Sequence, residues 1–422
     1  MTMLNRRANA EGTSRPPRLW STVLVVSCVL TMGLSGAAPA FAAEDVRSQQ
    51  WYLDDMQAEA MWKVSTGKDV KVAVVDTGVN LSTPSLRGQV LPGKDVTGEP
   101  GDENDDYSGH GTTMAELIAG TGKGGGLRGL APGAKIIPIR TVLKGMKVKG
   151  DDPDSFFRKI TDAKAIRAAA DSDAKIISMS FGGPGVSAEE WDATEYAAKK
   201  GKLLLAATGN EGQAGNKRNF PAGFPDVVGV ASISDTGKVS KTSTHTEDTT
   251  LSAPGADVPG WCDAKFKSYC GGDGGTSSAT AIASASAALI WSKHPEWNAN
   301  QVLRVLIDTA GRKAKNEAAS KYIGYGAVRP RMNLLEGKGD PGDPNQSPLF
   351  KKPKPTKPPS SGASEAAGSG GDTKPADKGK KARAAAETDG AGGGLLWGAV
   401  GAGAVVVVVA AGAFVVVRRR RA

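Results

Sequence analysis

The stretch Gly275-Thr276-Ser277-Ser278-Ala279 leads without a break into an Ala/Ser-rich segment that ends near His294. From Ala279 to Trp291 the chain has no charge and no proline, which favours a helix packed on all sides. The polar groups gather at its start, where free backbone N–H groups and the positive end of the helix dipole would stabilise an oxyanion. Taken alone, an ordinary serine cap on a core helix is the better explanation. The case for a nucleophile therefore depends on other residues.

Two residues elsewhere in the chain have the chemistry that a serine nucleophile requires. A serine hydroxyl attacks effectively when a base takes its proton and a carboxylate orients that base. The chain has only three histidines, and His110 stands just ahead of an apolar-periodic stretch. Asp76 ends the β-rich run 70–75, and open α/β sheets place their chemistry at the carboxyl ends of strands. The sequence thus offers Asp76, His110 and Ser277 as a catalytic set.

The motifs around these residues resemble the signatures of the subtilisin-like serine proteases, the subtilases, in the Asp, His, Ser order of that family. They are Asp76-Thr77-Gly78, His110-Gly111-Thr112 and Gly275-Thr276-Ser277-Ser278-Ala279. Asp-Thr-Gly alone would be a weak signal, because aspartic proteases share it. The resemblance implies an endopeptidase in which Ser277 attacks a peptide carbonyl, His110 acts as base and then acid, and Asp76 orients the imidazole. It implies no metal and no organic cofactor for the chemistry.

Two further segments resemble parts of the subtilase site. Residues 206–212 are similar to the segment whose asparagine completes the oxyanion hole, which would be Asn210. Without the triad, an Asn-containing turn would be the preferred interpretation. Residues 178–184 resemble the strand and turn that pair with the substrate backbone and line the primary pocket. The residues of that segment expected to bind substrate are Ser180, Phe181 and Gly182.

Residues 43–336 have the pattern of one α/β unit, large for a single domain but ordinary for an α/β enzyme. Apolar β-rich runs at 70–75, 135–139, 175–179, 203–207 and 227–231 alternate with helical stretches such as 156–170 and 188–199. Continuous apolar strands separated by helices predict a mostly parallel sheet that helices cover on both faces. With the family resemblance, the expected architecture is the three-layer subtilisin-like fold.

The first 42 residues predict a secretory signal peptide. They contain four arginines, a short apolar run and the cleavage pattern Ala40-Phe41-Ala42. The apolar run is short for the alternative, an N-terminal membrane anchor. About 33 residues then precede Asp76, which leaves no room for the folding pro-domain of many secreted subtilases. A short N-terminal extension into the first strand is expected instead.

The C-terminal part predicts a spacer and a membrane anchor. Residues 337–394 are rich in Pro, Gly, Ser, Lys and Ala, which is typical of a disordered spacer. The 23 residues 395–417 carry no charge and precede the arginine-rich tail 418–422, which predicts one transmembrane helix with a cytoplasmic C-terminus. A buried core helix is the alternative, but it would have nothing to pack against. The expected location is a bacterial cell membrane, with the catalytic domain extracytoplasmic.

Two loops near the expected site carry their own predictions. Cys262 and Cys270 stand eight positions apart before Ser277 and are expected to form a disulfide in an oxidising compartment. A metal pair is the lesser alternative, because no histidine is near in sequence. The acidic loop 102–106 is expected to be solvated, with calcium binding or attraction of a basic substrate as the alternatives.

The order of signal peptide, subtilase-like domain, Pro-rich spacer and single C-terminal helix resembles the mycosins, membrane-anchored subtilases associated with bacterial type VII secretion. It implies protein or peptide substrates and a type VII secretion membrane complex as partner. Two other functions stay open: a mainly structural subunit of that complex, with weak or dispensable proteolysis, and a general nutrient-degrading protease, which the anchor disfavours. The net charge of +9 does not indicate nucleic-acid binding, because the excess lies in the signal, the spacer and the final arginines.

Overall fold

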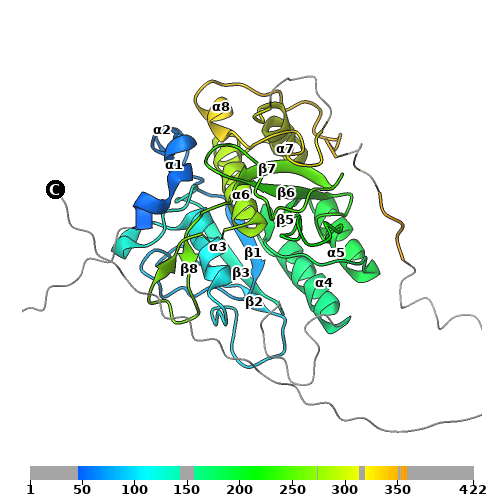
Figure 1. Cartoon of the computed structure of the whole chain (residues 1–422), viewed down its shortest axis with the longest axis horizontal. Coiled ribbons are helices and arrows are strands. Elements are labelled where there is room, and N and C mark those ends of the chain that lie inside the picture. Colours follow the sequence, from blue (N-terminus) through cyan, green and yellow to red (C-terminus); the bar gives the residue numbers. More distant parts are fainter. Residues whose placement is uncertain are drawn as a thin grey trace, which may run out of the picture. The chain divides into compact units, whose positions relative to one another are not determined.

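The computed structural model describes residues 46–142, 156–272, 274–312, 319–349, 352 and 354–358. Within them a seven-stranded sheet forms the middle of the molecule, in the order β2-β3-β1-β4-β5-β6-β7 (Figure 1). The strands are β1 (Lys71–Asp76), β2 (Lys94–Asp95), β3 (Lys135–Arg140), β4 (Ile176–Met179), β5 (Leu203–Ala207), β6 (Val227–Ile233) and β7 (Thr249–Pro254). All neighbouring strands pair in parallel, which confirms the predicted parallel sheet.

Helices cover both faces of this sheet (Figure 1). On one face lie α3 (His110–Ala119) and α6 (Thr276–Lys293), and on the other lie α4 (Phe156–Asp171) and α5 (Ala188–Lys199). In β1, Val72 and Val74 belong to the core with α3 and α6, whereas Ala73 and Val75 belong to the core with α4 and α5. Because side chains alternate along a strand, a strand buried on both faces is apolar throughout. The three-layer α/β architecture is confirmed.

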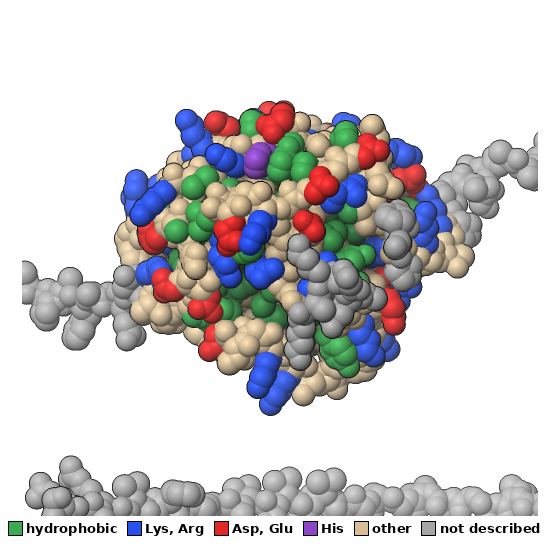
Figure 2. Space-filling model, turned by 90° about the horizontal axis from the view of Figure 1, so that it is seen from above, with side chains coloured by type: hydrophobic (Ala, Val, Ile, Leu, Met, Phe, Trp, Pro, Cys, Tyr) green, Lys and Arg blue, Asp and Glu red, His purple; other side chains and the backbone are tan. Residues whose placement is uncertain are grey.

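The shorter elements pack around these layers. They are η1 (Val46–Gln49), α1 (Trp51–Asp55), α2 (Ala58–Trp62), η2 (Lys123–Gly125), β8 (Gly260–Trp261), β9 (Tyr269–Cys270), α7 (Ala299–Asp308) and α8 (Pro330–Leu334). The N-terminal ones are part of the core, since Tyr52, Leu53 and Met61 are buried in the same cluster as α3 and α6. On the face seen in Figure 2, described basic and acidic side chains are interspersed, with hydrophobic ones between them.

The central helix α6 is buried as predicted. Every residue from Ser278 to Trp291 is buried, so small side chains let the sheet and the neighbouring helices approach from all directions. The chain before the helix is also crowded. A Cβ on Gly274 would lie 2.1 Å from the carbonyl oxygen of Gly255, and only glycine permits that approach of two backbones. The glycine run thus fixes where α6 begins.

The ordered chain continues past residue 336, where the sequence predicted the spacer to begin. The described residues 340–349, 352 and 354–358, here called the C-terminal strap, contact α7 and reach α5. The Asn298 and Asn300 amides donate to the Pro344 carbonyl at 2.9 and 2.8 Å, and Leu349 is buried. The Lys352 ammonium donates to three backbone carbonyls, those of Ala222, Phe224 and Val227. Composition did not reveal this segment, because main-chain carbonyls rather than apolar runs hold it.

A chain that ends at residue 336 is expected to be less stable than one that ends at residue 358. It loses Leu349 from the core and leaves the three carbonyls without the ammonium, which together cost about 3–5 kcal/mol. For a domain of this size the melting temperature should fall by roughly 5–10 °C. Thermal denaturation of the two chains, with Lys352→Met in the longer one as an intermediate case, checks this. Equal melting temperatures would contradict it.

The predicted signal peptide, the rest of the spacer and the predicted transmembrane segment 395–417 lie outside the described residues. Among the residues that are described, no helix is long and apolar enough to cross a membrane.

Candidate active site

Asp76 and His110 meet at the carboxyl end of β1. Asp76 is fully buried, and its Oδ1 accepts a hydrogen bond from the Thr77 backbone N–H at 2.8 Å. The same oxygen lies 2.7 Å from Nδ1 of His110, the first residue of α3. The imidazole is 38% exposed and lines a pocket. A carboxylate at Nδ1 keeps the proton on that nitrogen and leaves Nε2 as the acceptor.

The turn before His110 is organised by Asp106, the last residue of the acidic loop 102–106. The expectation that this loop is solvated is wrong for Asp106, which is buried because the surrounding N–H and hydroxyl groups all donate to it. This buried carboxylate accepts from the backbone N–H groups of Ser108, Gly109 and Thr112 at 2.8–3.0 Å. It also accepts from the hydroxyls of Thr77 and Thr112 at 2.8 and 2.6 Å. Asp106 caps the start of α3 by accepting from the Thr112 N–H of its first turn. An aspartate shortly before a predicted helix is the sequence signal of such a cap. Asp106 thus joins the end of β1 to the start of α3.

The pKa of His110 lies above its ordinary value. Burial of the imidazole lowers this pKa. The charge of Asp76, its hydrogen bond and the charge of Asp106 together raise the pKa by more than burial lowers it. Because the raising effects are larger together, the imidazole holds a proton more tightly than a free histidine. It is therefore well suited to take a proton from a nearby hydroxyl.

Ser277 stands in the first turn of α6. Its Oγ donates to the Ser180 backbone carbonyl at 2.9 Å, and the Ser180 hydroxyl donates back to the Ser277 carbonyl at 3.1 Å. Among the contacts of the described residues, no hydrogen bond joins Ser277 to His110, although both line one pocket. Catalytic contacts of this kind often form only when substrate is bound.

Asn210 lies beside Ser277, with its side-chain orientation fixed. Its Oδ1 accepts from both the backbone N–H and the hydroxyl of Thr276 at 3.1 Å. Because the oxygen is held there, Nδ2 is left to donate elsewhere. Asn210 borders both of the pockets that Ser277 borders, so its amide faces the same cleft in which an anion at Ser277 would form.

The predicted substrate-binding segment lines the pocket that contains His110 and Ser277. This hollow of about 360 Å³ is bordered by Ser180, Phe181 and Gly182, by Ala207 and Gly209–Glu211, and by Thr276. The structure therefore brings together the predicted catalytic, oxyanion-hole and substrate-binding residues, with Asp76 in contact with His110.

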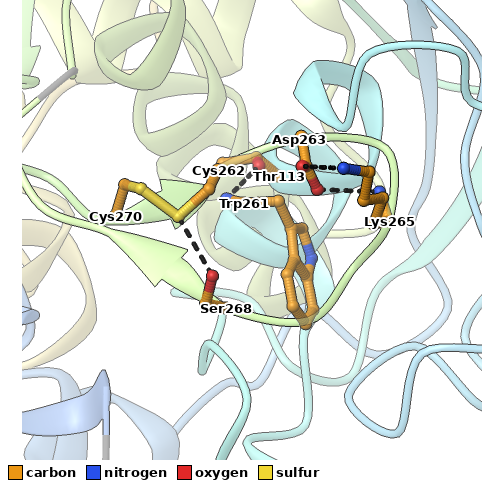
Figure 3. The surroundings of a disulfide bond; sticks show 7 residues. All are labelled: Thr113, Trp261, Cys262, Asp263, Lys265, Ser268 and Cys270. Atoms are coloured by element: carbon orange, nitrogen blue, oxygen red, sulfur yellow. Dashed lines mark hydrogen bonds and ion pairs between the residues drawn. A yellow bond between two sulfur atoms is a disulfide. The ribbon is translucent and has the colours of Figure 1, made fainter.

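A second hollow, of about 270 Å³, is also lined by Ser277, His110 and Asn210. One of its walls is the hairpin of β8 and β9, which the expected disulfide between Cys262 and Cys270 closes (Figure 3). The Trp261 backbone N–H donates to the Thr113 hydroxyl of α3 at 2.9 Å. The cysteines thus stiffen a wall of the cleft.

Comparison with known proteins places this site in a family. Residues 67–326, more than half of the chain, match the model of the Subtilase family. The chain is 34% identical over 210 residues to the major intracellular serine protease of Bacillus subtilis (strain 168), covering 48% of this chain and 63% of that protein. It is 33% identical over 211 residues to thermitase of Thermoactinomyces vulgaris, covering 50% and 71%. The chain thus spans a little less than two thirds of the first of these relatives.

Two solved structures are similar throughout the domain. The MycP3 protease from the type VII (ESX-3) secretion system matches with a TM-score of 0.58 and 28% identity, covering 67% of this chain and 87% of that one. The serine protease MycP1, described as an essential component of the type VII (ESX-1) secretion system, matches with a TM-score of 0.58 and 26% identity, covering 68% and 88%. By sequence and by structure, this chain belongs to the subtilase family.

Proposed function

We propose that this chain is a membrane-anchored, extracytoplasmic serine endopeptidase that processes proteins linked to type VII secretion. The observation that carries the peptidase proposal is the 2.7 Å contact between Asp76 Oδ1 and His110 Nδ1, in a site that also holds Ser277 and Asn210. Membership of the subtilase family supports the serine chemistry, and the likeness to the MycP1 and MycP3 structures supports the link to secretion.

In the proposed mechanism, a peptide binds in extended form along Ser180–Gly182, with main-chain hydrogen bonds and a side chain in the adjoining pocket. His110 takes the proton of Ser277 as its oxygen attacks the carbonyl carbon, and the buried Asp76 stabilises the imidazolium. The oxyanion accepts from Asn210 Nδ2 and the Ser277 backbone N–H, where the dipole of α6 adds to the effect. His110 then protonates the leaving amine, and water releases the acyl group by the same route.

The second candidate is a mainly structural subunit of the secretion complex. The Ser277 hydroxyl bonded to Ser180 instead of His110 favours weak intrinsic proteolysis. Replacing the chromosomal copy with Ser277→Ala distinguishes the two. Loss of substrate processing with unchanged secretion would support an enzyme whose cleavage is dispensable, and unchanged processing would overturn the proposed function.

Membrane fractionation of the chain with and without residues 395–422 tests the proposed anchor. If the anchor is real, the shortened protein is released from the membrane fraction.

The pH dependence of kcat/KM should show an acid limb with its midpoint above pH 6.5. His110 must be neutral to act as base, and its pKa is raised above 6.5, so activity is lost as the pH falls through that raised value. Initial rates on a peptide substrate between pH 5 and 9, measured at low substrate concentration, give the midpoint. A midpoint at or below 6.5 would be inconsistent with the Asp76 and Asp106 contacts.

Asn210→Ala is expected to lower kcat by about a hundred- to a thousandfold, the loss known for the equivalent donor in the relative subtilisin, with little change in KM. The amide binds charge that develops only after attack, so substrate binding should be spared. Steady-state kinetics of Asn210→Ala measure kcat and KM. Asn300→Ala, which removes an asparagine on α7 away from the site, is the control variant. A rise in KM with kcat unchanged would assign Asn210 to substrate binding instead.

A further inference from the structure

The buried carboxylic acid Glu116 has no role in the mechanism proposed above. It lies on α3, six residues after His110, and is fully buried. Its Oε1 accepts from the Thr83 hydroxyl at 2.9 Å, and its Oε2 accepts from the Tyr269 hydroxyl at 2.8 Å. The Trp261 indole N–H faces the same carboxyl without reaching hydrogen-bond geometry. A buried acid with three neutral donors around it is costly, so its presence here calls for a structural reason.

Tyr269 connects Glu116 to the disulfide-closed hairpin. Tyr269 of β9 pairs with Trp261 of β8, and their rings stack with centroids 3.9 Å apart. The backbone of Trp261 is bound to Thr113 in turn. The hairpin is therefore attached to α3 at Thr113 and at Glu116, which lie one turn apart on the same side of that helix (Figure 3 shows the Thr113 attachment).

Residues of both α3 and the hairpin region line the second hollow that borders Ser277. Its apolar lining includes Met114 of α3 on one side and Val258, Pro259 and Trp261 of the hairpin region on the other. Neither Glu116 nor Tyr269 lines this hollow. If a substrate lies along Ser180–Gly182 up to the bond that is cut, the residues after that bond enter this second hollow. Next to the hairpin the lining is apolar and suits an apolar side chain, whereas Ser108, Asn210 and Ser278 make the rest of the hollow polar.

We propose that Glu116 is a positioning residue for the leaving-group side of the cleft: through Tyr269 it holds Trp261 and the hairpin at the spacing from α3 that admits an apolar residue directly after the scissile bond. This inference rests on the proposed peptidase function. Because α3 also begins with His110, the base and this wall of the cleft are carried by one helix. Burial raises the pKa of Glu116 to about 7, although the hydrogen bonds from Tyr269 and Thr83 lower it. A carboxyl group keeps an oxygen that can accept from Tyr269 in either protonation state.

Two substrates separate this role from a general structural one. Both carry the same residues before the scissile bond, chosen from a panel of peptide p-nitroanilides. The first is the best p-nitroanilide itself, which has no residue after the bond. The second is an internally quenched peptide that continues for four residues, with Leu directly after the bond. Only the second carries an amino-acid side chain and a continuing main chain into the hollow beside the hairpin, because the flat p-nitroaniline leaving group of the first has neither.

In the full chain, Tyr269→Phe and Glu116→Met remove the donor and the acceptor of the same hydrogen bond. Each should lower kcat/KM on the extended peptide roughly tenfold, the scale of one well-fitted pocket contact, while p-nitroanilide hydrolysis changes less than twofold. Glu116→Gln keeps an acceptor for Tyr269 and should restore most of the loss. Tyr322→Phe, on an exposed tyrosine, is the matched control and should leave both rates unchanged.

Equal losses on the two substrates, or no loss on either, would overturn the inference. A second measurement uses the wild-type chain alone, so it does not depend on the folding of variants. Extended peptides with Leu after the bond should be cleaved roughly ten times faster than those with Asp there, and equal rates would also overturn it. Wild-type chain that hydrolyses neither kind of substrate would instead refute the proposed function, and the inference with it. Hydrolysis of the p-nitroanilide separates these two failures.

Discussion

Ser277→Ala should lower kcat by about a million-fold, the scale of loss when the nucleophile of the relative subtilisin is removed. Without the hydroxyl there is no acyl-enzyme, and what remains comes from the oxyanion donors and from binding. KM should change little, because the removed hydroxyl acts on the carbonyl carbon in the chemical step rather than in binding. Progress curves at high enzyme concentration with a fluorogenic peptide measure the residual rate.

Ser278→Ala is the matched control for that prediction. Ser278 is the neighbouring hydroxyl of α6 and is buried, so its loss tests whether any serine at the start of this helix matters. We expect wild-type activity within a few-fold. If Ser278→Ala were inactive and Ser277→Ala active, the assignment of the nucleophile would be wrong.

Asp76→Asn should lower kcat by about ten thousandfold, as the equivalent change does in other Ser-His-Asp enzymes, with the fold intact. The amide favours the wrong tautomer of His110 and no longer compensates the charge that the imidazole gains. The same variant has a second readout. The charge and hydrogen bond of Asp76 raise the pKa of His110, so their loss should move the acid limb of kcat/KM to lower pH.

Measurement of kcat and of the pH profile for Asp76→Asn checks both parts. Lys71, at the other end of β1, forms an exposed ion pair with Asp173. Asp173→Asn is therefore a control for loss of an aspartate charge away from the site, and it should be silent. A loss of kcat below tenfold in Asp76→Asn would mean that His110 is oriented by other contacts.

The parts of the fold that follow from local pattern were predictable from the sequence. β1 is apolar on both faces because helices cover both, and α6 lacks charges because it is buried on all sides. The same positions are the frame of the site, since Asp76 ends β1 and Ser277 begins α6. The motifs therefore predicted which residues the fold brings together, and the disulfide followed from two cysteines close in sequence.

What the sequence did not reveal depends on contacts between distant segments. Asp106 and Glu116 look like ordinary acidic residues until the fold places donors around them. The strap has the composition of a spacer, and its order comes from Lys352 reaching carbonyls more than 120 residues away in sequence. The resting contact of Ser277 with Ser180 is likewise a matter of side-chain rotation. The signal peptide and the membrane helix remain predictions.

The central claim is that Ser277 is an activated nucleophile, and covalent labelling with a fluorophosphonate probe tests it most directly. Residues 43–358, which keep the C-terminal strap, would be compared as wild type, Ser277→Ala and Ser278→Ala, with folding checked by thermal denaturation. The account predicts labelling of wild type and Ser278→Ala and none of Ser277→Ala. Folded wild-type protein that stays unlabelled would contradict it and favour the structural role.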